Sequence, residues 1–388
     1  MSKNFYGHIL KAEQIIARFD RQHPLHYQLK EFFRTHKECG SKDRKVISQT
    51  VYNFFRLGRA LENLPLHDRL AVANYLIDNI SYDKAHLIAD DALTVRIENV
   101  KQHYPAFELS DVFPFTNLLS DKINLQHFAL SFLQRPLVWL RVKSNGSAET
   151  QDEFNRLNIE FRKHDWGSDK FETWSVASES KLTATQSYLK GLFEIQDLSS
   201  QQTLKHISVN PADKVWDCCC GAGGKSLLIH NIEPEVKITA TDVRQQSLNN
   251  LKERFKRAGI INYESYVADA SQPFNEYPEK SFELIIADVP CSGSGTWART
   301  PEMLTAFDTN SLTEFSERQF NIACNAFRYL KPGGHLIYIT CSVFQKENEA
   351  VVNRLAIQMN TLPLLTEYII NHINKADSMF VAVFKKNS

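Results

Sequence analysis

Two cysteines occupy equivalent positions, each shortly after a segment that is typical of a buried strand. Cys291 follows the segment Phe282–Asp288, and Cys341 follows Gly334–Thr340. The carboxyl ends of strands in an open α/β sheet are where such proteins bind their ligands. A single cysteine is most often a small buried hydrophobic residue, but two at neighbouring strand ends indicate thiol chemistry in one cleft.

Aspartates end four successive predicted strands: Asp217, Asp242, Asp269 and Asp288. An acid at the end of the second strand commonly binds the diol of a ribose. The first of the four opens a glycine-rich turn, Asp217-Cys-Cys-Cys-Gly-Ala-Gly-Gly-Lys225. Glycines allow the backbone of such a turn to approach a ligand closely.

The glycine-rich turn differs from two common nucleotide motifs. Ser226 stands where the third glycine of G-x-G-x-x-G would fall, which disfavours an NAD oxidoreductase, and only Gly224 and Lys225 of the P-loop pattern are present. Strand-end acids without a pyrophosphate motif favour S-adenosyl-L-methionine as the cofactor. For the turn taken alone, a tight turn without a ligand is the simplest alternative.

Thiols beside a methyl donor predict one reaction in particular. C5 of a pyrimidine is a poor nucleophile, but a thiolate that adds to C6 makes C5 enamine-like, so C5 can take a methyl group. A base then removes the C5 proton and the thiol departs. The thiolate is the reactive form of cysteine, whose ordinary pKa is about 8.5. A carboxyl group near N3 would stabilise the adduct, and we expect Asp288 in that role.

The elements that must position these residues alternate between strand and helix from about residue 193 onward. This alternation predicts a doubly wound α/β fold for residues 193–388. Helices are expected at Gln246–Ala258 and Ser311–Leu330. The predicted strands are Lys214–Cys220, Lys237–Asp242, Tyr263–Asp269, Phe282–Asp288, Gly334–Thr340 and Met379–Lys385.

The first third of the chain is predicted to be helical, and residues 136–190 to form a small α+β unit. Ser41 can cap a helix whose apolar face includes Val51 and Phe55. Residues 1–60 contain 12 Lys and Arg against five Asp and Glu, a net charge of +7, whereas residues 61–135 carry −4. Charge sorted in this way favours nucleic-acid binding by the basic segment, although the whole chain has 45 residues of each sign.

Composition and cysteine spacing exclude several classes. The seven cysteines are odd in number and include no Cys-x-x-Cys pair, so neither a disulfide framework nor a structural zinc site is expected. There is no run of the ~18–20 apolar residues that a membrane helix needs, and the first residues lack the apolar core of a signal peptide. We therefore expect a cytoplasmic monomer that uses no metal and binds no membrane.

These motifs resemble those of the RsmB/NOP2/Sun group of RNA (cytosine-5)-methyltransferases. The cofactor loop of that group, Asp-x-Cys-Ala-Ala-Pro-Gly-Gly-Lys-Thr, is similar to Asp217–Ser226, and its Asp-Ala-Pro-Cys-Ser-Gly-x-Gly motif is similar to Asp288–Gly295. Its late motifs and its entry motif resemble Leu330–Gly334, Thr340–Glu349 and Phe193–Ser200.

The resemblance implies roles for individual residues. Cys341 would be the nucleophile, and Cys291 would assist release of the methylated RNA, a choice that the residues alone leave open. The cofactor-binding residues would be Cys219, Cys220, Gly221, Ala222, Gly223, Gly224, Lys225, Asp242, Asp269 and Asp288.

The resemblance also implies a domain order and a substrate. A NusB-like helical RNA-binding domain would span 1–133, an RRM-like α+β subdomain 136–190, and a Rossmann-like methyltransferase domain 193–388. The implied substrate is 16S ribosomal RNA, with tRNA as one alternative and an assembly factor with weakened catalysis as another. The last alternative rests on Cys220-Gly221-Ala222 standing where the group has Ala-Ala-Pro, because proline fixes φ and its loss loosens the turn.

Overall fold

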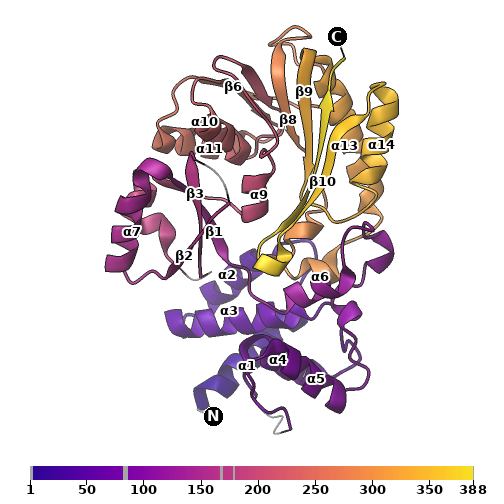
Figure 1. Cartoon of the computed structure of the whole chain (residues 1–388). Helices are drawn as coiled ribbons and strands as arrows, with labels where there is room; N and C mark the ends of the chain where they lie inside the picture. The colour runs from indigo at the N-terminus through magenta and orange to yellow at the C-terminus, as the bar shows by residue number, and fades with distance from the viewer. Residues whose placement is uncertain (1–2, 82–85, 167–168, 178–179, 388) are drawn as a thin grey trace. The chain divides into compact units, whose positions relative to one another are not determined.

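The computed structural model describes residues 3–81, 86–166, 169–177 and 180–387, with the side chains of residues 3–5 left aside. The chain divides into two compact units (Figure 1). Of the charges counted above, the Lys3 side chain, Asp83 and Lys84 lie outside the described residues. The first unit comprises Met1–Leu119, Ile123–Arg135 and Trp297–Asp308; the second comprises Ser120–Lys122, Pro136–Thr296 and Thr309–Ser388.

The first unit is helical, as expected. Its first four helices pack around an apolar core that includes Ile9, Leu29, Ile47 and Leu70. Its α-helices are α1 (Lys3–Ala17), α2 (Leu25–Thr35), α3 (Ser41–Arg56), α4 (Leu66–Asp78), α5 (Leu93–His103), α6 (Leu125–Phe132) and α12 (Met303–Ala306), with short 3-10 turns η1 (Leu109–Val112) and η2 (Thr116–Leu118).

The start of α3 differs from the prediction. Ser41 is the first helical residue and not the cap, a position that Gly40 occupies. The Asp43 carboxylate accepts a hydrogen bond from the Gly40 N–H at 2.9 Å. A side chain three residues into the helix therefore satisfies the exposed backbone donor, as in a capping box.

A short segment from late in the sequence, Trp297–Asp308, belongs to the first unit. The buried Trp297 ring lies 5.6 Å from the Phe115 ring and 4.9 Å from the Phe307 ring. Glu302 of the same segment accepts a hydrogen bond from the Leu25 N–H at 3.3 Å. The aromatic core of the first unit is thus completed by residues that follow Cys291 in the sequence.

The second unit contains a seven-stranded sheet of the α/β type, in the order β10-β11-β9-β8-β5-β6-β7. Strands β7, β6, β5, β8 and β9 pair in parallel, and β11 and β10 add an antiparallel edge. The strands are β5 (Lys214–Asp217), β6 (Lys237–Asp242), β7 (Tyr263–Val267), β8 (Phe282–Asp288), β9 (Leu330–Thr340), β10 (Pro363–Ile370) and β11 (Ser378–Lys385).

Helices cover both faces of this sheet, so its central strands are buried on both sides (Figure 1). On one face, α10 (Gly224–Ile232) and α11 (Gln245–Ala258) pack with Leu227, Leu251 and Phe255. On the other face, α13 (Ser311–Arg328) and α14 (Glu349–Gln358) contribute Ile322 and Leu355 to the apolar core. This two-faced burial explains the continuous apolar runs of the strands.

The strand boundaries agree with the sequence in the middle of the sheet and differ at its ends. β6 and β8 have the predicted bounds, but β5 ends at Asp217 and β7 ends at Val267, so Cys218–Cys220 and Asp269 lie in loops. β10 was not predicted. It is an edge strand that begins with a proline and leaves Leu364 exposed, so it lacks the signal of a buried strand.

A second sheet has four antiparallel strands in the order β2-β3-β1-β4. Its fourth strand lies beyond residue 190, where the small α+β unit was predicted to end. Its elements are β1 (Val138–Lys143), η3 (Ser144–Gly146), α7 (Ser147–Arg156), β2 (Phe161–His164), β3 (Phe171–Val176), η4 (Leu182–Ala184), α8 (Gln186–Leu189) and β4 (Phe193–Ile195). The remaining elements of the second unit are α9 (Leu198–Gln202), η5 (Ser294–Thr296) and η6 (His372–Asn374).

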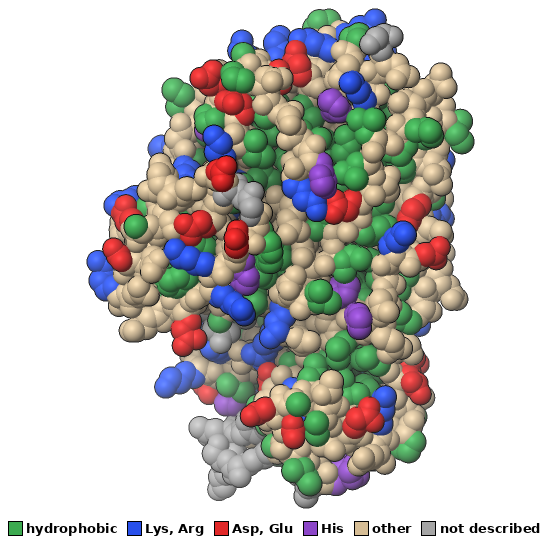
Figure 2. Space-filling model, viewed as in Figure 1, with side chains coloured by type: hydrophobic (Ala, Val, Ile, Leu, Met, Phe, Trp, Pro, Cys, Tyr) green, Lys and Arg blue, Asp and Glu red, His purple; other side chains and the backbone are tan. Residues whose placement is uncertain are grey.

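The surface carries charges of both signs. On the face seen in Figure 2, Lys and Arg side chains are interspersed with Asp and Glu side chains. No helix in the described part of the chain is long and apolar enough to cross a membrane. Within the same residues, no group of three or more His, Cys, Asp and Glu side chains could hold a metal ion.

Candidate active site

A cavity of about 430 Å³ lies in the second unit, beside the carboxyl ends of its central parallel strands. Residues from several loops that follow these strands meet in its wall. Six of the predicted site residues line it: Cys219, Gly221, Asp242, Asp269, Asp288 and Cys291. Cys218, Val243 and Arg318 also line it and were not predicted.

The cofactor loop turns sharply at two glycines with positive φ. Gly221 has φ +52° and Gly223 has φ +79°. A Cβ at Gly223 would lie 3.0 Å from both Leu251 and Phe255, whereas open space surrounds the position at Gly221. Gly223 therefore lets the loop pack against α11, and Gly221 leaves room on the side that lines the cavity.

Asp242 ends β6 and holds the cofactor loop from the opposite side. Its Oδ2 accepts a hydrogen bond from the Gly221 N–H at 3.0 Å, and its Oδ1 accepts one from the Arg244 N–H at 2.8 Å. The side chain is buried, yet it forms part of the cavity wall. A carboxylate in this position at the end of the second strand suits a ribose diol.

Asp269 has a more exposed position. It lies two residues beyond β7, and its Oδ1 accepts hydrogen bonds from the Ser271 N–H at 2.9 Å and from the Ser271 hydroxyl at 2.7 Å. These bonds fix the loop, and Asp269 also lines the cavity.

Lys225 and Asp288 form an ion pair that joins the cofactor loop to the end of β8. Lys225 Nζ lies 2.9 Å from Asp288 Oδ2 and donates a further bond to the Ser200 hydroxyl at 2.9 Å. Lys225 is buried, whereas Asp288 is partly exposed and lines the cavity. The pair fixes the Asp288 carboxylate at the point where it faces a ligand.

Asp217, at the end of β5, lies beneath the cofactor loop and is fully buried. Its Oδ2 accepts a hydrogen bond from the Ser226 hydroxyl at 2.6 Å, and its Oδ1 has no partner among the described residues. Burial raises the pKa of this carboxyl to about 7, because the charged form loses its hydration. Asp217 is therefore a structural support of the loop and does not line the cavity.

Cys218 and Cys220 are also buried. The pKa of Cys218 is raised mainly by a hydrogen bond with Cys219 and, second, by burial. Burial also raises the pKa of Cys220. Both thiols therefore stay protonated near neutral pH. Cys219, between them, is partly exposed and lines the cavity together with Cys218.

The two thiols after β8 and β9 lie together. β8 and β9 are parallel neighbours in the sheet, and Cys291 Sγ lies 3.2 Å from Cys341 Sγ. Both residues are partly exposed, and Cys291 lines the cavity. The hydrogen bond with Cys341, followed by burial, raises the pKa of Cys291 well above its ordinary value. Cys291 is thus a protonated thiol in contact with a second sulfur.

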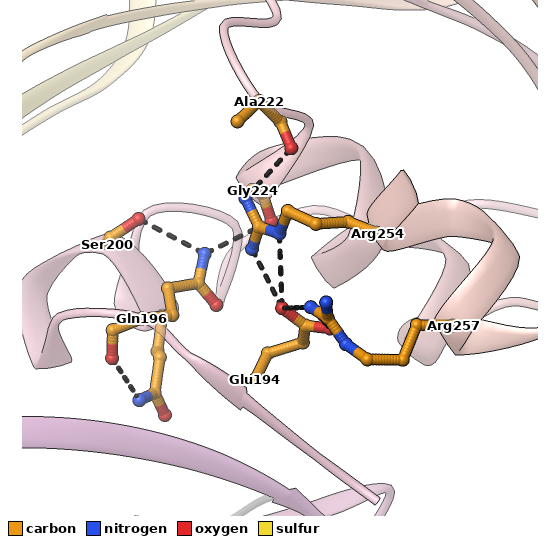
Figure 3. Close-up of polar contacts among 8 residues, drawn as sticks. Glu194, Gln196, Ser200, Ala222, Gly224, Arg254 and Arg257 are labelled. Atoms are coloured by element: carbon orange, nitrogen blue, oxygen red, sulfur yellow. Dashed lines mark hydrogen bonds and ion pairs between the residues drawn. The ribbon is translucent and has the colours of Figure 1, made fainter. Parts of the chain in front are cut away.

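The remaining loop residues are held by polar side chains from α11 and from the residue that follows β4 (Figure 3). Arg254 Nη1 donates to the Ala222 carbonyl at 2.8 Å, and its guanidinium is paired with Glu194 at 2.9 Å. Gln196 Nε2 donates to the Gly224 carbonyl at 3.2 Å. The loop that lacks the proline of the related group is therefore fixed through its carbonyl oxygens.

Sequence reasoning missed one buried acid behind the thiols. Glu347 is fully buried and contacts the serines that follow Cys291 and Cys341. It lies within the predicted motif Thr340–Glu349, but a charged residue in a loop gives no sequence signal for burial.

Comparison with known proteins agrees with this geometry. Residues 205–385 match the family model "16S rRNA methyltransferase RsmB/F". The ribosomal RNA small subunit methyltransferase B of Enterobacter sp. (strain 638) is 31% identical over 216 residues, which cover 55% of this chain and 50% of that protein. The protein of the same name from Klebsiella pneumoniae (strain ATCC 700721 / MGH 78578) is 28% identical over 224 residues, 55% of this chain and 49% of that protein. The chain thus spans about half the length of the curated relatives it matches.

Solved structures show the same fold. The crystal structure of PH0851 matches with a TM-score of 0.72 at 19% identity and covers 97% of each chain. A methyltransferase homologue from Pyrococcus horikoshii matches with a TM-score of 0.57 at 22% identity, covering 69% of this chain and 92% of that one. Residues 205–385 of this protein are therefore similar to RsmB/F methyltransferases, and the fold, a Rossmann-like sheet preceded by a helical unit, is shared with these solved structures.

Proposed function

We propose that this protein is an S-adenosyl-L-methionine-dependent RNA cytosine-C5 methyltransferase that acts on 16S ribosomal RNA. The observation that carries the proposal is the pair of thiols 3.2 Å apart, of which Cys291 lines the same cavity as Asp288. A methyltransferase needs no cysteine to transfer a methyl group to a good nucleophile. Paired thiols beside the cofactor loop suit a carbon that must first be activated by covalent addition.

The residues present fit the cofactor. Gly221 leaves open space beside the cavity, and the Asp242 carboxylate stands at the end of β6, where a ribose diol would be held. Cys219, Asp269 and Asp288 complete the proposed contacts, while Cys220, Ala222, Gly223, Gly224 and Lys225 shape the loop. When bound, S-adenosyl-L-methionine supplies an electrophilic methyl group.

Cys341 is the proposed nucleophile. Its thiolate forms a bond to C6 of the cytosine, and the C5–C6 π electrons move onto C5, which then takes the methyl group. Loss of the C5 proton to a base returns the electrons to the C5–C6 bond and expels the Cys341 thiolate. The second sulfur supports this order of events, because Cys291 keeps its proton and can donate a hydrogen bond to the departing sulfur.

Asp288 is proposed to contact N3 of the same base. Negative charge builds up on the pyrimidine ring as the thiolate adds to C6, so a proton held near N3 lowers the barrier. Lys225 fixes this carboxylate from the protein side at 2.9 Å, which leaves the cavity side free for the base. The pair also links the position of the cofactor loop to that of the base.

The first unit is proposed to be a NusB-like RNA-binding domain. A cavity of about 660 Å³ beside α2 is lined by Arg18, Lys30 and Arg34, together with the exposed ring of Tyr27. Asp20 and Glu31 line it too, so the cavity wall carries charges of both signs, with a basic excess. Cationic side chains beside an aromatic ring suit single-stranded RNA, whose phosphates and bases they contact.

The four-stranded sheet is proposed to be the RRM-like subdomain. Its strand order and its β-α-β-β-α-β sequence of elements support this assignment. One face of the sheet carries Trp139, which is buried against Leu198 and Ala376 of the same unit. RNA stacking on that face, the usual RRM mode, is therefore not part of the proposal.

The choice of 16S ribosomal RNA rests on the names of the related proteins, and we further infer a cytoplasmic monomer. The test is transfer of labelled methyl groups from S-adenosyl-L-methionine to purified 16S ribosomal RNA and, separately, to tRNA. We expect 5-methylcytidine in the ribosomal RNA alone, identified by mass mapping. Labelling of tRNA alone would replace the substrate, and labelling of neither RNA would contradict the proposed activity. A double variant, Arg18→Gln with Lys30→Gln, should weaken RNA binding and reduce its dependence on salt.

A further inference from the structure

The buried Glu347 carboxylate connects the two loops that carry the thiols. Glu347 has no solvent exposure. Its Oε1 accepts hydrogen bonds from the Ser292 N–H at 2.8 Å and from Gln319 Nε2 at 3.0 Å. Its Oε2 accepts from the hydroxyls of Ser292 and Ser342, each at 2.5 Å. Four donors therefore converge on one side chain, which is what a buried charge requires.

Three of the four donors belong to the residues that directly follow the two thiols. Ser292 directly follows Cys291, and Ser342 directly follows Cys341. The Glu347 carboxylate thus joins the residue after one thiol to the residue after the other. A backbone bond from the Gly295 N–H to the Cys341 carbonyl at 2.9 Å joins the same two loops a second time.

The third partner ties this arrangement to a helix. Gln319, on α13, also donates from Nε2 to the carbonyl of Pro290, the residue before Cys291, at 2.9 Å. The Glu347 carbonyl in turn accepts a bond from the Tyr338 hydroxyl of β9 at 2.6 Å. Glu347, which lies in the same loop as Cys341, is therefore tied to α13 and to β9.

We propose that Glu347 is a positioning residue that sets the distance between the Cys291 and Cys341 sulfurs. The proposal rests on the proposed function for its catalytic consequence, because the two thiols must act on the same bond in turn. Without Glu347, four buried donors lose this acceptor, and the two loops keep only their other connections, such as the bond from the Gly295 N–H to the Cys341 carbonyl. A displacement of about 1 Å at a reacting centre can cost roughly 100-fold in rate.

A glutamine in this position separates geometry from charge. Its carbonyl oxygen can accept from the Ser292 N–H and Gln319, and its amide can donate to the two serine hydroxyls, which rotate to accept. Glu347→Gln therefore keeps the connections but removes the charge, and Glu347→Ala removes both. The Glu347 charge is one of the causes that raise the pKa of Cys291, so both variants alter that thiol alike.

A second buried glutamate provides a matched control. Glu153, on α7, accepts from the N–H groups of Gln186 and Ser187 at 2.6 and 2.7 Å and from the Ser187 hydroxyl at 2.5 Å. It lies in the four-stranded part of the second unit and contacts neither thiol loop. Glu153→Ala should cost comparable stability and leave the sulfurs where they are.

The distance between the sulfurs can be measured without RNA or cofactor. Diamide oxidises two thiols to a disulfide: the thiols lose two protons and two electrons, which reduce the azo bond to a hydrazine, and an S–S bond of about 2.05 Å forms. The full-length protein is treated with diamide, and the peptide that links Cys291 to Cys341 is followed by mass spectrometry.

We expect the linked peptide to form in Glu347→Gln within about threefold of the wild-type rate, and about tenfold more slowly in Glu347→Ala. Glu153→Ala should link at the wild-type rate. If Glu347→Ala does not fold, Ser342→Ala takes its place, with an intermediate rate expected. Linking of Glu347→Ala, or of its replacement, at the Glu347→Gln rate would overturn the proposal.

Kinetics then connect the distance to catalysis. Glu347→Ala should lower kcat for RNA methylation about 100-fold, with KM for RNA and cofactor within about threefold, and Glu347→Gln should restore most of kcat. Equal loss in both variants would overturn positioning in favour of charge. If no variant, including the wild type, methylates RNA, the proposed function fails, while the linking experiment still decides the role of Glu347.

Discussion

The two ends of the proposed active site are held in different ways. At the thiol end, the buried Glu347 carboxylate receives four hydrogen bonds, two of them from serine hydroxyls that lie inside the protein. At the cofactor end, the loop after β5 is held at its carbonyl oxygens by Arg254 and Gln196, and at one N–H by Asp242. One end is a dense buried network, and the other is a glycine-rich loop with separate supports.

The difference follows from the chemistry proposed for each end. One sulfur that bonds to C6 and a second that donates a hydrogen bond to it as it departs need a fixed separation, and buried hydrogen-bonded networks supply rigidity. A loop that admits a ligand must instead leave backbone groups accessible, and glycines at 221 and 223 provide the conformations for that. We therefore expect substitutions at the thiol end to change kcat and those at the cofactor end to change cofactor affinity.

The largest effect is expected from Cys341→Ala, which removes the proposed nucleophile. Activity should fall at least about 10⁴-fold, since the thiolate proposed to add to C6 is lost, and the Kd for S-adenosyl-L-methionine should stay within about twofold. Methyl transfer and calorimetry measure the two quantities. Full activity in this variant would assign the nucleophile elsewhere, with Cys291 as the first candidate.

The next effect is expected from Cys291→Ala. Release of the methylated RNA should become slow, so turnover falls roughly 10²–10³-fold while the first covalent step still proceeds. A protein–RNA adduct that survives a denaturing gel should accumulate. The double variant Cys291→Ala with Cys341→Ala is the control, and an adduct in that variant would contradict the assignment of Cys341.

The buried Asp217 carboxyl beneath the cofactor loop predicts that the free energy of unfolding depends on pH. Its folded-state pKa of about 7 exceeds the ordinary value of about 3.9. Between these two pH values, the folded protein holds a proton that the unfolded chain has lost. This contribution to stability is present at low pH and is lost as pH rises from about 4 to about 7, by on the order of 4 kcal/mol. Asp217→Asn should remove that pH dependence and still accept the bond from Ser226.

Urea unfolding at pH 5, 6 and 8 measures the Asp217 effect. The free energy of unfolding of the wild type should fall relative to that of the variant across the series. An unchanged difference between the two proteins would show that Asp217 titrates near its ordinary pKa.

The smallest effect is expected from Arg254→Ala, which removes the bond to the Ala222 carbonyl. The Kd for S-adenosyl-L-methionine should rise about 3–10-fold, the range for one charge-assisted hydrogen bond that is partly exposed, and kcat should change little. Arg257→Ala is the matched control, because Arg257 pairs with the same Glu194 but does not contact the loop (Figure 3). Equal weakening by both variants would assign the effect to Glu194 and not to the loop.

The sequence predicted the centre of the sheet and the acids at its edge because apolar runs of strand length end in aspartate there. β6 and β8 have the predicted bounds, and Asp242 and Asp288 end them. The same reasoning failed for β10, which is an edge strand with exposed residues such as Leu364. A continuous apolar run in the sequence indicates a strand that is buried on both faces, and β10 has no such burial.

The interactions behind the site could not be predicted, because they join residues far apart in the sequence. Glu347 and Ser292 are 55 positions apart, and Arg254 and Ala222 are 32 apart. A glutamate or an arginine in a loop or on a helix is most often a solvated residue. Its partner becomes visible only when the fold brings the two together. The placement of Gly40, and not Ser41, at the cap of α3 is a smaller case, decided by Asp43 three residues later.

The segment Trp297–Asp308 has a consequence for how the protein can be divided and inherited. Its residues belong to the first unit, although more than 160 positions of the second unit separate them from the rest of it, ending at the loop after Cys291. A cut between Arg135 and Pro136 would leave the first unit without Trp297, whose ring packs among Phe113, Phe115 and Phe307. A single crossover at this boundary would therefore not transfer the first unit intact.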